Sequence, residues 1–293
     1  MNHLELFSGT HSFGKVSSKL DYNVYSLDRD LGSKCPFTDY ESDHHFKEDI
    51  MTWDYKQFDK GFFKIITASP VCLWWSQLRK TWIGRKLKAH GDTIITQEIL
   101  DEDIQKYGVP MVDKIFEIID YFNPDYYIIE NPKTGRMKDY INDSIPYYDV
   151  DYCKYSNWGY KKTTRFWTNI EGLEFNKCKN DCENIITIKT QEGAKHTGYG
   201  TLIKSKNRTL HKNPIGDSKK AVTKTQKIHK CNMACSKNII DNGKIIRVNT
   251  AVLRKKYKDY ESTKSGSKQT TKYERYRIPT KIIEMFFNKI LLQ

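Results

Sequence analysis

Two short polar segments contain the side chains best suited to covalent and acid–base chemistry. Cys72 follows a Ser-Pro-Val turn directly after the apolar run Lys64–Ala68. A thiolate there is a nucleophile able to form a covalent intermediate, provided that its surroundings are electropositive and part-exposed. Glu130 directly follows a second apolar run, Tyr126–Ile129, where a carboxyl group needs a role such as general-acid catalysis. The alternatives are a buried structural cysteine and a capping or ion-paired glutamate.

A third segment has the features of a turn that binds a nucleotide-like cofactor. The chain runs from an expected strand, His3–Phe7, through the turn Ser8–Ser12 into an expected helix, Phe13–Leu20. Gly9 lets the backbone of this turn approach a ligand closely. Asp28 lies about 20 residues further on, where an acid can accept hydrogen bonds from ribose hydroxyls. The alternatives are a tight structural turn and a surface acid.

An α/β domain is needed to bring these segments together. Strands are expected at Tyr22–Leu27, Tyr148–Tyr152 and Arg165–Thr168, and the spacing of apolar residues predicts a helix at Met111–Phe122. Strands that alternate with helices indicate a mostly parallel sheet, and ligands bind beyond the carboxyl ends of the strands in such sheets. Because the polar turns directly follow strands, the sequence predicts one site at that edge.

The composition changes after about residue 171. Residues 176–238 are rich in Lys, Asn and Thr, residues 254–277 are basic, and Asn242-Gly243 predicts a hairpin turn within Asn238–Val248. Pro279–Leu292 is expected to form an amphipathic helix that packs back on the first domain, because the basic region offers little apolar surface. We therefore expect a catalytic domain of residues 1–170 and 276–293, with residues 171–275 as an inserted lobe.

Composition narrows the class of protein and its partners. The chain has 49 Lys and Arg against 36 Asp and Glu, a net charge of +13, which favours a polyanion such as nucleic acid. Its 13 Phe, 6 Trp and 19 Tyr argue against a disordered chain, and no apolar stretch is long enough to span a membrane. The odd count of 7 Cys, with no leader expected, favours a reducing intracellular compartment. Two Cys-x3-Cys pairs are candidate ligands for a structural zinc, or else surface thiols: Cys178, Cys182, Cys231 and Cys235.

Four motifs in this order resemble those of the C5-cytosine-specific DNA methyltransferases. FSGTHS at residues 7–12 is similar to the family's F-x-G-x-G, SPVC at 69–72 to P-P-C, ENP at 130–132 to E-N-V, and KKTTR at 161–165 to Q-x-R-x-R. The resemblance covers residues 3–170 and the last helix, and is greatest to compact members from bacteriophages and large DNA viruses. It implies a Rossmann-like S-adenosylmethionine-dependent methyltransferase domain with a small basic target-recognition lobe.

The resemblance also implies roles for individual residues. Cys72 would attack carbon 6 of a flipped cytosine, Glu130 would hold or protonate N3, and Arg165 would orient the base and Glu130. In the S-adenosylmethionine site Phe7 would pack on the adenine, Gly9 would line the methionine end, Asp28 would bind the ribose and Asp49 the adenine amino group. The other expected cofactor contacts are Ser8, Thr10, Ser12, Ile50 and Pro70.

A basic segment after Cys72 is the expected loop that closes on DNA. It spans residues 73–109 and includes Arg79, Lys80, Arg85, Lys86 and Lys88, whose charges suit phosphates. The family resemblance implies double-stranded DNA as the partner, with no membrane partner, and we expect a monomer. If the protein is viral, its expected location is the host cytoplasm, the nucleus or a viral factory.

Three departures from the family pattern leave other functions open. His11 replaces the second glycine of the first motif, Val71 replaces the second proline, and Lys162 stands where the first arginine is usual. If the glycine position requires a positive φ, His is among the few residues that tolerate it, at a cost. The alternatives are a methyltransferase that acts on cytosine in RNA such as tRNA, a catalytically weak or inactive DNA-binding protein, and a nicotinamide enzyme that lacks the full G-x-G-x-x-G.

Overall fold

The contacts divide the chain into two units. The computed structural model describes residues 1–29, 42, 44–141, 143–158, 160–191, 195–197, 200–202, 223–229, 236–241, 244–249 and 276–293, with side chains up to residue 185 and from residue 276. Unit 1 comprises Met1–Val150, Thr163–Phe175 and Tyr276–Gln293. Unit 2 comprises Asp151–Lys162 and Asn176–Arg275.

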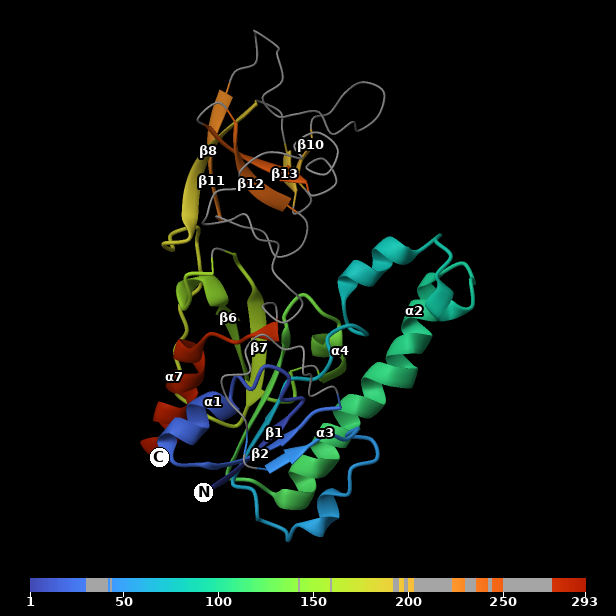
Figure 1. The fold of residues 1–293 in the computed structure, drawn as a ribbon, viewed down its shortest axis with the longest axis vertical. Helices are drawn as coiled ribbons and strands as arrows, with labels where there is room; N and C mark the ends of the chain where they lie inside the picture. The colour runs from blue at the N-terminus through green and yellow to red at the C-terminus, as the bar shows by residue number, and fades with distance from the viewer. Residues whose placement is uncertain are drawn as a thin grey trace. The chain divides into compact units, whose positions relative to one another are not determined.

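A seven-stranded sheet forms the centre of unit 1, with the strand order β3-β2-β1-β4-β5-β7-β6 (Figure 1). The strands are β1 (Asn2–Leu6), β2 (Asn23–Leu27), β3 (His44–Phe46), β4 (Ile65–Ala68), β5 (Tyr126–Pro132), β6 (Tyr147–Asp151) and β7 (Thr163–Thr168). Strands β1 to β5 pair in parallel, and β7 is antiparallel to β5. The parallel order 3-2-1-4-5 is that of a Rossmann-like doubly wound sheet, so the predicted α/β fold class is confirmed.

Helices cover both faces of this sheet because its strands alternate between two sets of apolar neighbours (Figure 1). Leu4 of β1 belongs to the core cluster that α3 (Val109–Phe122) completes with residues at three- and four-residue spacing. His3 points to the other face, where its ring nitrogens lie 2.7 Å from Ser17 Oγ and 2.8 Å from Thr67 Oγ1. Ser17 ends the short helix α1 (Gly14–Ser17), which a 3-10 turn continues to Leu20.

The last helix, α7 (Thr280–Leu291), packs on the same face as α1, as the sequence predicts. The ring of Phe287 meets the ring of His3 edge to face at 5.7 Å, and Phe286 contacts Phe166 of β7 at 5.3 Å. Just before the helix, the backbone N–H of Ile278 donates to Ser12 Oγ at 3.2 Å. The end of the chain therefore supports the turn that follows β1.

The segment after β4 is more helical than the sequence indicates. It contains 3-10 turns at Gln77–Trp82 and Lys88–His90, then α2 (Gln97–Asp103) and a π-helical turn, Ile104–Gly108, that continues into α3 (Figure 1). Gly108 makes room for the buried ring of Trp75, since a Cβ on Gly108 would lie 3.0 Å from that ring. A shorter helix, α4 (Met137–Ile141), follows β5.

Unit 2 contains three antiparallel strand pairs among its described residues. β8 (Ile185–Gln191) pairs with β11 (Thr223–His229), and β9 (Lys195–Thr197) pairs with β10 (Gly200–Leu202). β12 (Ser236–Asp241) pairs with β13 (Lys244–Asn249) in a register that sets Asp241 opposite Lys244, which confirms the predicted hairpin. Its turn, Asn242-Gly243, lies outside the described residues. Across the described part of the chain, no helix has the length and apolar character to cross a membrane.

Candidate active site

The turn after β1 has an unusual backbone. Phe7, Gly9 and His11 have positive φ angles of 56°, 43° and 51°. For a bulky residue such as Phe7 this conformation costs about 1–3 kcal/mol, and such strain concentrates at functional sites. The expectation for His11 is confirmed: it adopts the left-handed conformation that the replaced glycine would adopt.

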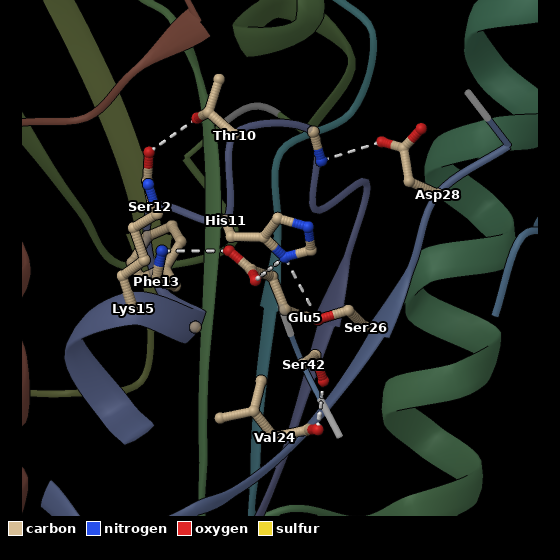
Figure 2. A network of polar contacts seen from close by, with 12 residues as sticks. Glu5, Thr10, His11, Ser12, Phe13, Lys15, Val24, Ser26, Asp28 and Ser42 are labelled. Carbon is tan, nitrogen blue, oxygen red and sulfur yellow. Dashed lines mark hydrogen bonds and ion pairs between the residues drawn. The ribbon is translucent and has the colours of Figure 1, made fainter. Parts of the chain in front are cut away.

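Buried polar groups hold His11 in place from beneath (Figure 2). Its Nδ1 lies 3.6 Å from Glu5 Oε2 and 3.4 Å from Ser26 Oγ. The other oxygen of the same carboxylate, Glu5 Oε1, accepts a hydrogen bond of 3.0 Å from the backbone N–H of Phe13. Glu5 therefore fixes both ends of the His11 turn, which explains how the chain accommodates histidine at this position.

Asp28 reaches the same turn from the end of β2. Its Oδ2 accepts a hydrogen bond of 2.9 Å from the backbone N–H of Gly9 (Figure 2). A Cβ on Gly9 would be 3.7 Å or more from its neighbours, so it is the positive φ, not crowding, that requires glycine here. The hydroxyls of Thr10 and Ser12 lie 2.9 Å apart in the same turn, where Ser8 is buried.

The expected adenine contacts lie one strand further along the sheet. Asp49 follows β3, accepts a hydrogen bond of 3.0 Å from the backbone N–H of Met51 and forms an exposed ion pair of 3.4 Å with Arg29. Its neighbour Ile50 is buried in the core cluster. The ends of β2 and β3 are joined, because the backbone N–H of Asp28 donates to Phe46 O at 3.1 Å. The roles of Asp49 and Ile50 stay predictions.

The segment that contains Cys72 is tied to both neighbouring strands. The backbone N–H of Ser69 donates to Leu6 O of β1 at 3.2 Å, and Asn131 Nδ2 of β5 donates to Pro70 O at 2.9 Å. Asn131 is fully buried, and its Oδ1 has no hydrogen-bond partner among the residues that the structure describes. Cys72, two residues beyond Pro70, is half-buried. The sequence analysis missed Asn131, although it lies in the ENP motif.

The pairing of β5 with β7 fixes the faces on which Glu130 and Arg165 lie. Glu130 is opposite Phe166, and Asn131 is opposite Arg165. Since paired residues of antiparallel strands share a face, Arg165 lies on the face of Asn131 and Glu130 on the other. Glu130 is only 6% exposed. Arg165 and Glu130 therefore lie on opposite faces of the paired strands, and the orienting role of Arg165 toward Glu130 stays a prediction.

Two cations share one carboxylate beside Asn131. Arg165 donates from Nε and from Nη2 to Asp149 at 2.8 Å and 3.2 Å, and Lys133 Nζ lies 2.6 Å from Asp149 Oδ2. Burial alone would raise the pKa of Asp149, but the hydrogen bonds from Arg165 and Lys133 outweigh it and lower the pKa. The guanidinium of Arg165 also lies 3.5 Å from the centre of the Tyr147 ring. Burial would lower the pKa of Arg165, but Asp149 and the charge of a second carboxylate, Asp143, raise it.

Counting back from Arg165 in the pattern Q-x-R-x-R puts Thr163, not Lys162, at the first-arginine position. The structure corrects one expectation about the basic segment after Cys72. Arg79 is only 2% exposed and so is not available to a phosphate. It pairs with Asp103, which also lies 2.9 Å from His90 Nε2.

The other basic residues of that segment remain on the surface. Lys80, Arg85, Lys86 and Lys88 are exposed. Burial would raise the pKa of Asp103, but its hydrogen bonds from His90 and Arg79 lower it. The buried ion pair of Arg79 and Asp103 therefore stabilises the segment on whose surface the other basic residues lie.

Three cysteines of unit 2 form a separate cluster. The sulfurs of Cys153, Cys178 and Cys182 all lie within 4.8 Å of one another. The sequence analysis named two of them but missed Cys153, since it stands alone in the sequence. Cys231 and Cys235 lie outside the described residues.

The chain is similar to a curated viral protein and, at low identity, to several solved structures. The chain is 40% identical over 188 residues to a probable DNA (cytosine-5)-methyltransferase of Frog virus 3 (isolate Goorha). The matched region covers 63% of this chain and 79% of the relative. No protein-family model matches the chain. Among solved structures, S. pombe Dnmt2 methyltransferase is 15% identical with a TM-score of 0.35, and covers 60% of this chain and 51% of its own. The Entamoeba histolytica methyltransferase EhMeth is 14% identical with a TM-score of 0.40, over 61% of this chain and 57% of its own.

Proposed function

The chain belongs to the family of DNA (cytosine-5)-methyltransferases, and from this we propose that it transfers a methyl group to carbon 5 of cytosine in double-stranded DNA. One observation carries the proposal: Asn131 Nδ2 is bonded to Pro70 O at 2.9 Å. This bond joins the segment of the nucleophile, Cys72, to the strand end of the acid, Glu130. The segment of Cys72 lies beside the strained turn after β1, since the backbone N–H of Ser69 donates to Leu6 O, at the point where the strand order reverses and α/β sheets bind ligands.

The residues of the first turn fit S-adenosylmethionine. Gly9 leaves the backbone open, Asp28 presents a carboxylate at the end of the second strand, and Phe7 offers an aromatic ring at a strained position. Ser8, Thr10, Ser12, Asp49 and Pro70 are the further proposed contacts. When bound, S-adenosylmethionine supplies an electrophilic methyl group.

Cys72 and Glu130 divide the chemistry between them. As the Cys72 thiolate bonds to carbon 6 of the base, Glu130 gives a proton to N3, which makes carbon 5 nucleophilic. After methylation, carbon 5 gives its proton to solvent water, the electron pair of that C–H bond forms the C5–C6 double bond as the bond from sulfur to carbon 6 breaks, and the N3 proton returns to Glu130. The thiolate is thus regenerated. Arg165, held by Asp149, is proposed to orient the base.

We also propose a division of labour between the two units. The base must leave the duplex to reach Cys72, so the enzyme acts on a flipped cytosine. Unit 1 carries the chemistry. The lysine-rich unit 2, which includes Asn176–Arg275 of the expected lobe 171–275, recognises the target sequence. The exposed cations after Cys72 then contact the phosphates.

Transfer of a labelled methyl group tests the proposal. We expect the full chain to label mixed-sequence duplex DNA and Cys72→Ser to lose the label while DNA binding persists. Labelling of tRNA but not DNA would replace the substrate by RNA. Binding of DNA without transfer to either acceptor, in protein that binds S-adenosylmethionine, would replace the enzyme by a DNA-binding protein of the same fold.

A further inference from the structure

We infer that unit 2 contains a zinc site formed by Cys153, Cys178 and Cys182, separate from the methyl-transfer site. Cys153 lies in the 3-10 turn Tyr152–Lys154, directly after β6. Cys178 and Cys182 lie near the start of the second segment of unit 2, Asn176–Arg275. Their sulfurs lie within 4.8 Å of one another. Around a tetrahedral zinc with Zn–S bonds of about 2.3 Å, ligand sulfurs are about 3.8 Å apart, so small rotations of the side chains bring the three sulfurs to three of the four ligand positions.

The backbone around Cys178 suits a metal-bound thiolate. The N–H groups of Asn180 and Asp181 both donate hydrogen bonds to the sulfur of Cys178. The chain turns back here because Asn180 adopts a positive φ of 64°, a conformation that Asn tolerates better than most residues. Hydrogen bonds of this kind fix the orientation of a metal ligand.

Buried polar contacts hold the two cysteine-bearing segments together. Asp151 Oδ2 accepts hydrogen bonds from the backbone N–H of Cys178 at 2.8 Å and, as an ion pair, lies 3.2 Å from Lys161 Nζ. Asn184, which is buried, donates from Nδ2 to Cys153 O at 2.9 Å and to Ser156 O at 2.7 Å. The three thiols are therefore positioned by their surroundings rather than meeting by chance.

Charge and packing both favour a cation at this place. Three thiolates around Zn²⁺ carry one net negative charge. Lys154, whose Nζ lies 3.0 Å from Asp181, is next to this loop, and its positive charge partly offsets that of the thiolates. The large core cluster of the described residues belongs to unit 1, and the described side chains of unit 2 add a smaller buried group that includes Tyr152 and Tyr160. A metal that joins Cys153 to Cys178 and Cys182 would close the two segments that flank β7 and stabilise unit 2.

The test uses the full chain, purified in reductant and dialysed to remove weakly bound metal. We expect elemental analysis by mass spectrometry to give one zinc per chain. The zinc content should be the same in Cys72→Ser, which we expect to be inactive in methyl transfer. Cys153→Ser and Cys178→Ser should lose the zinc. Cobalt in place of zinc should give thiolate-to-metal charge-transfer absorption, whose intensity counts the sulfur ligands.

Two results would overturn the inference. One is reduced wild-type protein that binds neither zinc nor cobalt in stoichiometric amount. The other is full retention of zinc by Cys153→Ser, which would assign the metal to other cysteines. If the serine variants fail to fold, Cys182→His is the deciding variant, because histidine can replace a thiolate as a zinc ligand. Retained zinc with weaker charge-transfer absorption of the cobalt form supports the site. A cobalt spectrum unchanged from that of the wild type contradicts it. Because zinc is also measured in Cys72→Ser, the outcome is independent of methyl transfer.

Discussion

Replacement of Asn131 by alanine should slow methyl transfer more than it weakens the fold. Asn131 Nδ2 donates the bond to Pro70 O that holds the nucleophile segment against β5. Its Oδ1 already has no hydrogen-bond partner among the described residues, so the substitution removes one hydrogen bond and no other. Asn131→Ala frees the segment that carries Cys72 and leaves the first turn and Asp28 untouched.

The size of the effect follows from the burial of this bond. A buried carbonyl that loses its donor costs about 1–3 kcal/mol. If the displacement of Cys72 appears fully in the barrier, the rate of methyl transfer falls by about 5- to 150-fold. Binding of S-adenosylmethionine should change by less than about threefold, because Pro70 is the only one of its proposed contacts that lies in the freed segment. Asn131→Asp should slow transfer at least as much, since it sets a carboxylate against the carbonyl of Pro70.

A matched variant separates positioning from stability. Asn169 Nδ2 donates to Asp125 O, also at 2.9 Å, near the opposite end of β5. Asn169→Ala removes this bond and the bond of 3.0 Å from the backbone N–H of Tyr127 to Asn169 Oδ1, both exposed and far along the strand from Glu130, so it should lower the melting temperature without slowing transfer. Single-turnover rates and thermal unfolding of both variants give the comparison. The reasoning is refuted if Asn131→Ala transfers methyl groups within about twofold of the wild-type rate.

Three further predictions concern stability and cofactor binding. Burial lowers the pKa of His3 from 6.5 to about 3, so between these pH values the unfolded chain binds a proton that the folded chain does not. Stability should therefore decrease as the pH is lowered from about 6.5 to about 3, by up to about 1.4 kcal/mol per pH unit; urea unfolding of His3→Gln should show a shallower pH dependence. Asp103→Asn leaves the buried Arg79 without its ion-pair partner and should lower the free energy of unfolding by about 3 kcal/mol. Asp28→Asn weakens the bond to Gly9 N and should raise the Kd for S-adenosylmethionine by about tenfold in calorimetry.

Each of these predictions has a clear contrary result. An unfolding free energy that depends equally on pH in His3→Gln would show that other groups dominate the acid limb. Unchanged unfolding of Asp103→Asn would mean that Arg79 finds another partner at no cost. Tight cofactor binding by Asp28→Asn would exclude the carboxylate from the cofactor site.

Local patterns in the sequence were sufficient for the elements that position the site. Apolar runs that end in polar turns predict β1, β4 and β5, because buried strands must stop where the chain meets solvent. The amphipathic spacing of α7 predicts that it packs on the first domain, which Phe287 confirms by its contact with His3. The left-handed backbone at His11 could be anticipated from the glycine that it replaces.

Contacts between distant residues could not be predicted in this way. A basic residue such as Arg79 appears exposed in the sequence, and its burial depends on Asp103, 24 residues away. Cys153 lacks a nearby cysteine, so only the fold brings it to Cys178 and Cys182. The face shared by Asn131 and Arg165 follows from the register of β5 and β7, which local sequence does not determine.

Covalent trapping is the most direct test of the proposed methyl transfer. The protein is mixed with S-adenosylmethionine and a mixed-sequence duplex that contains 5-fluorocytosine, whose fluorine blocks release of the enzyme after transfer. We predict an adduct that resists denaturation, with the modified peptide containing Cys72. Protein that binds S-adenosylmethionine yet forms no adduct with any duplex, or an adduct at another cysteine, would contradict the assignment of Cys72 as the nucleophile.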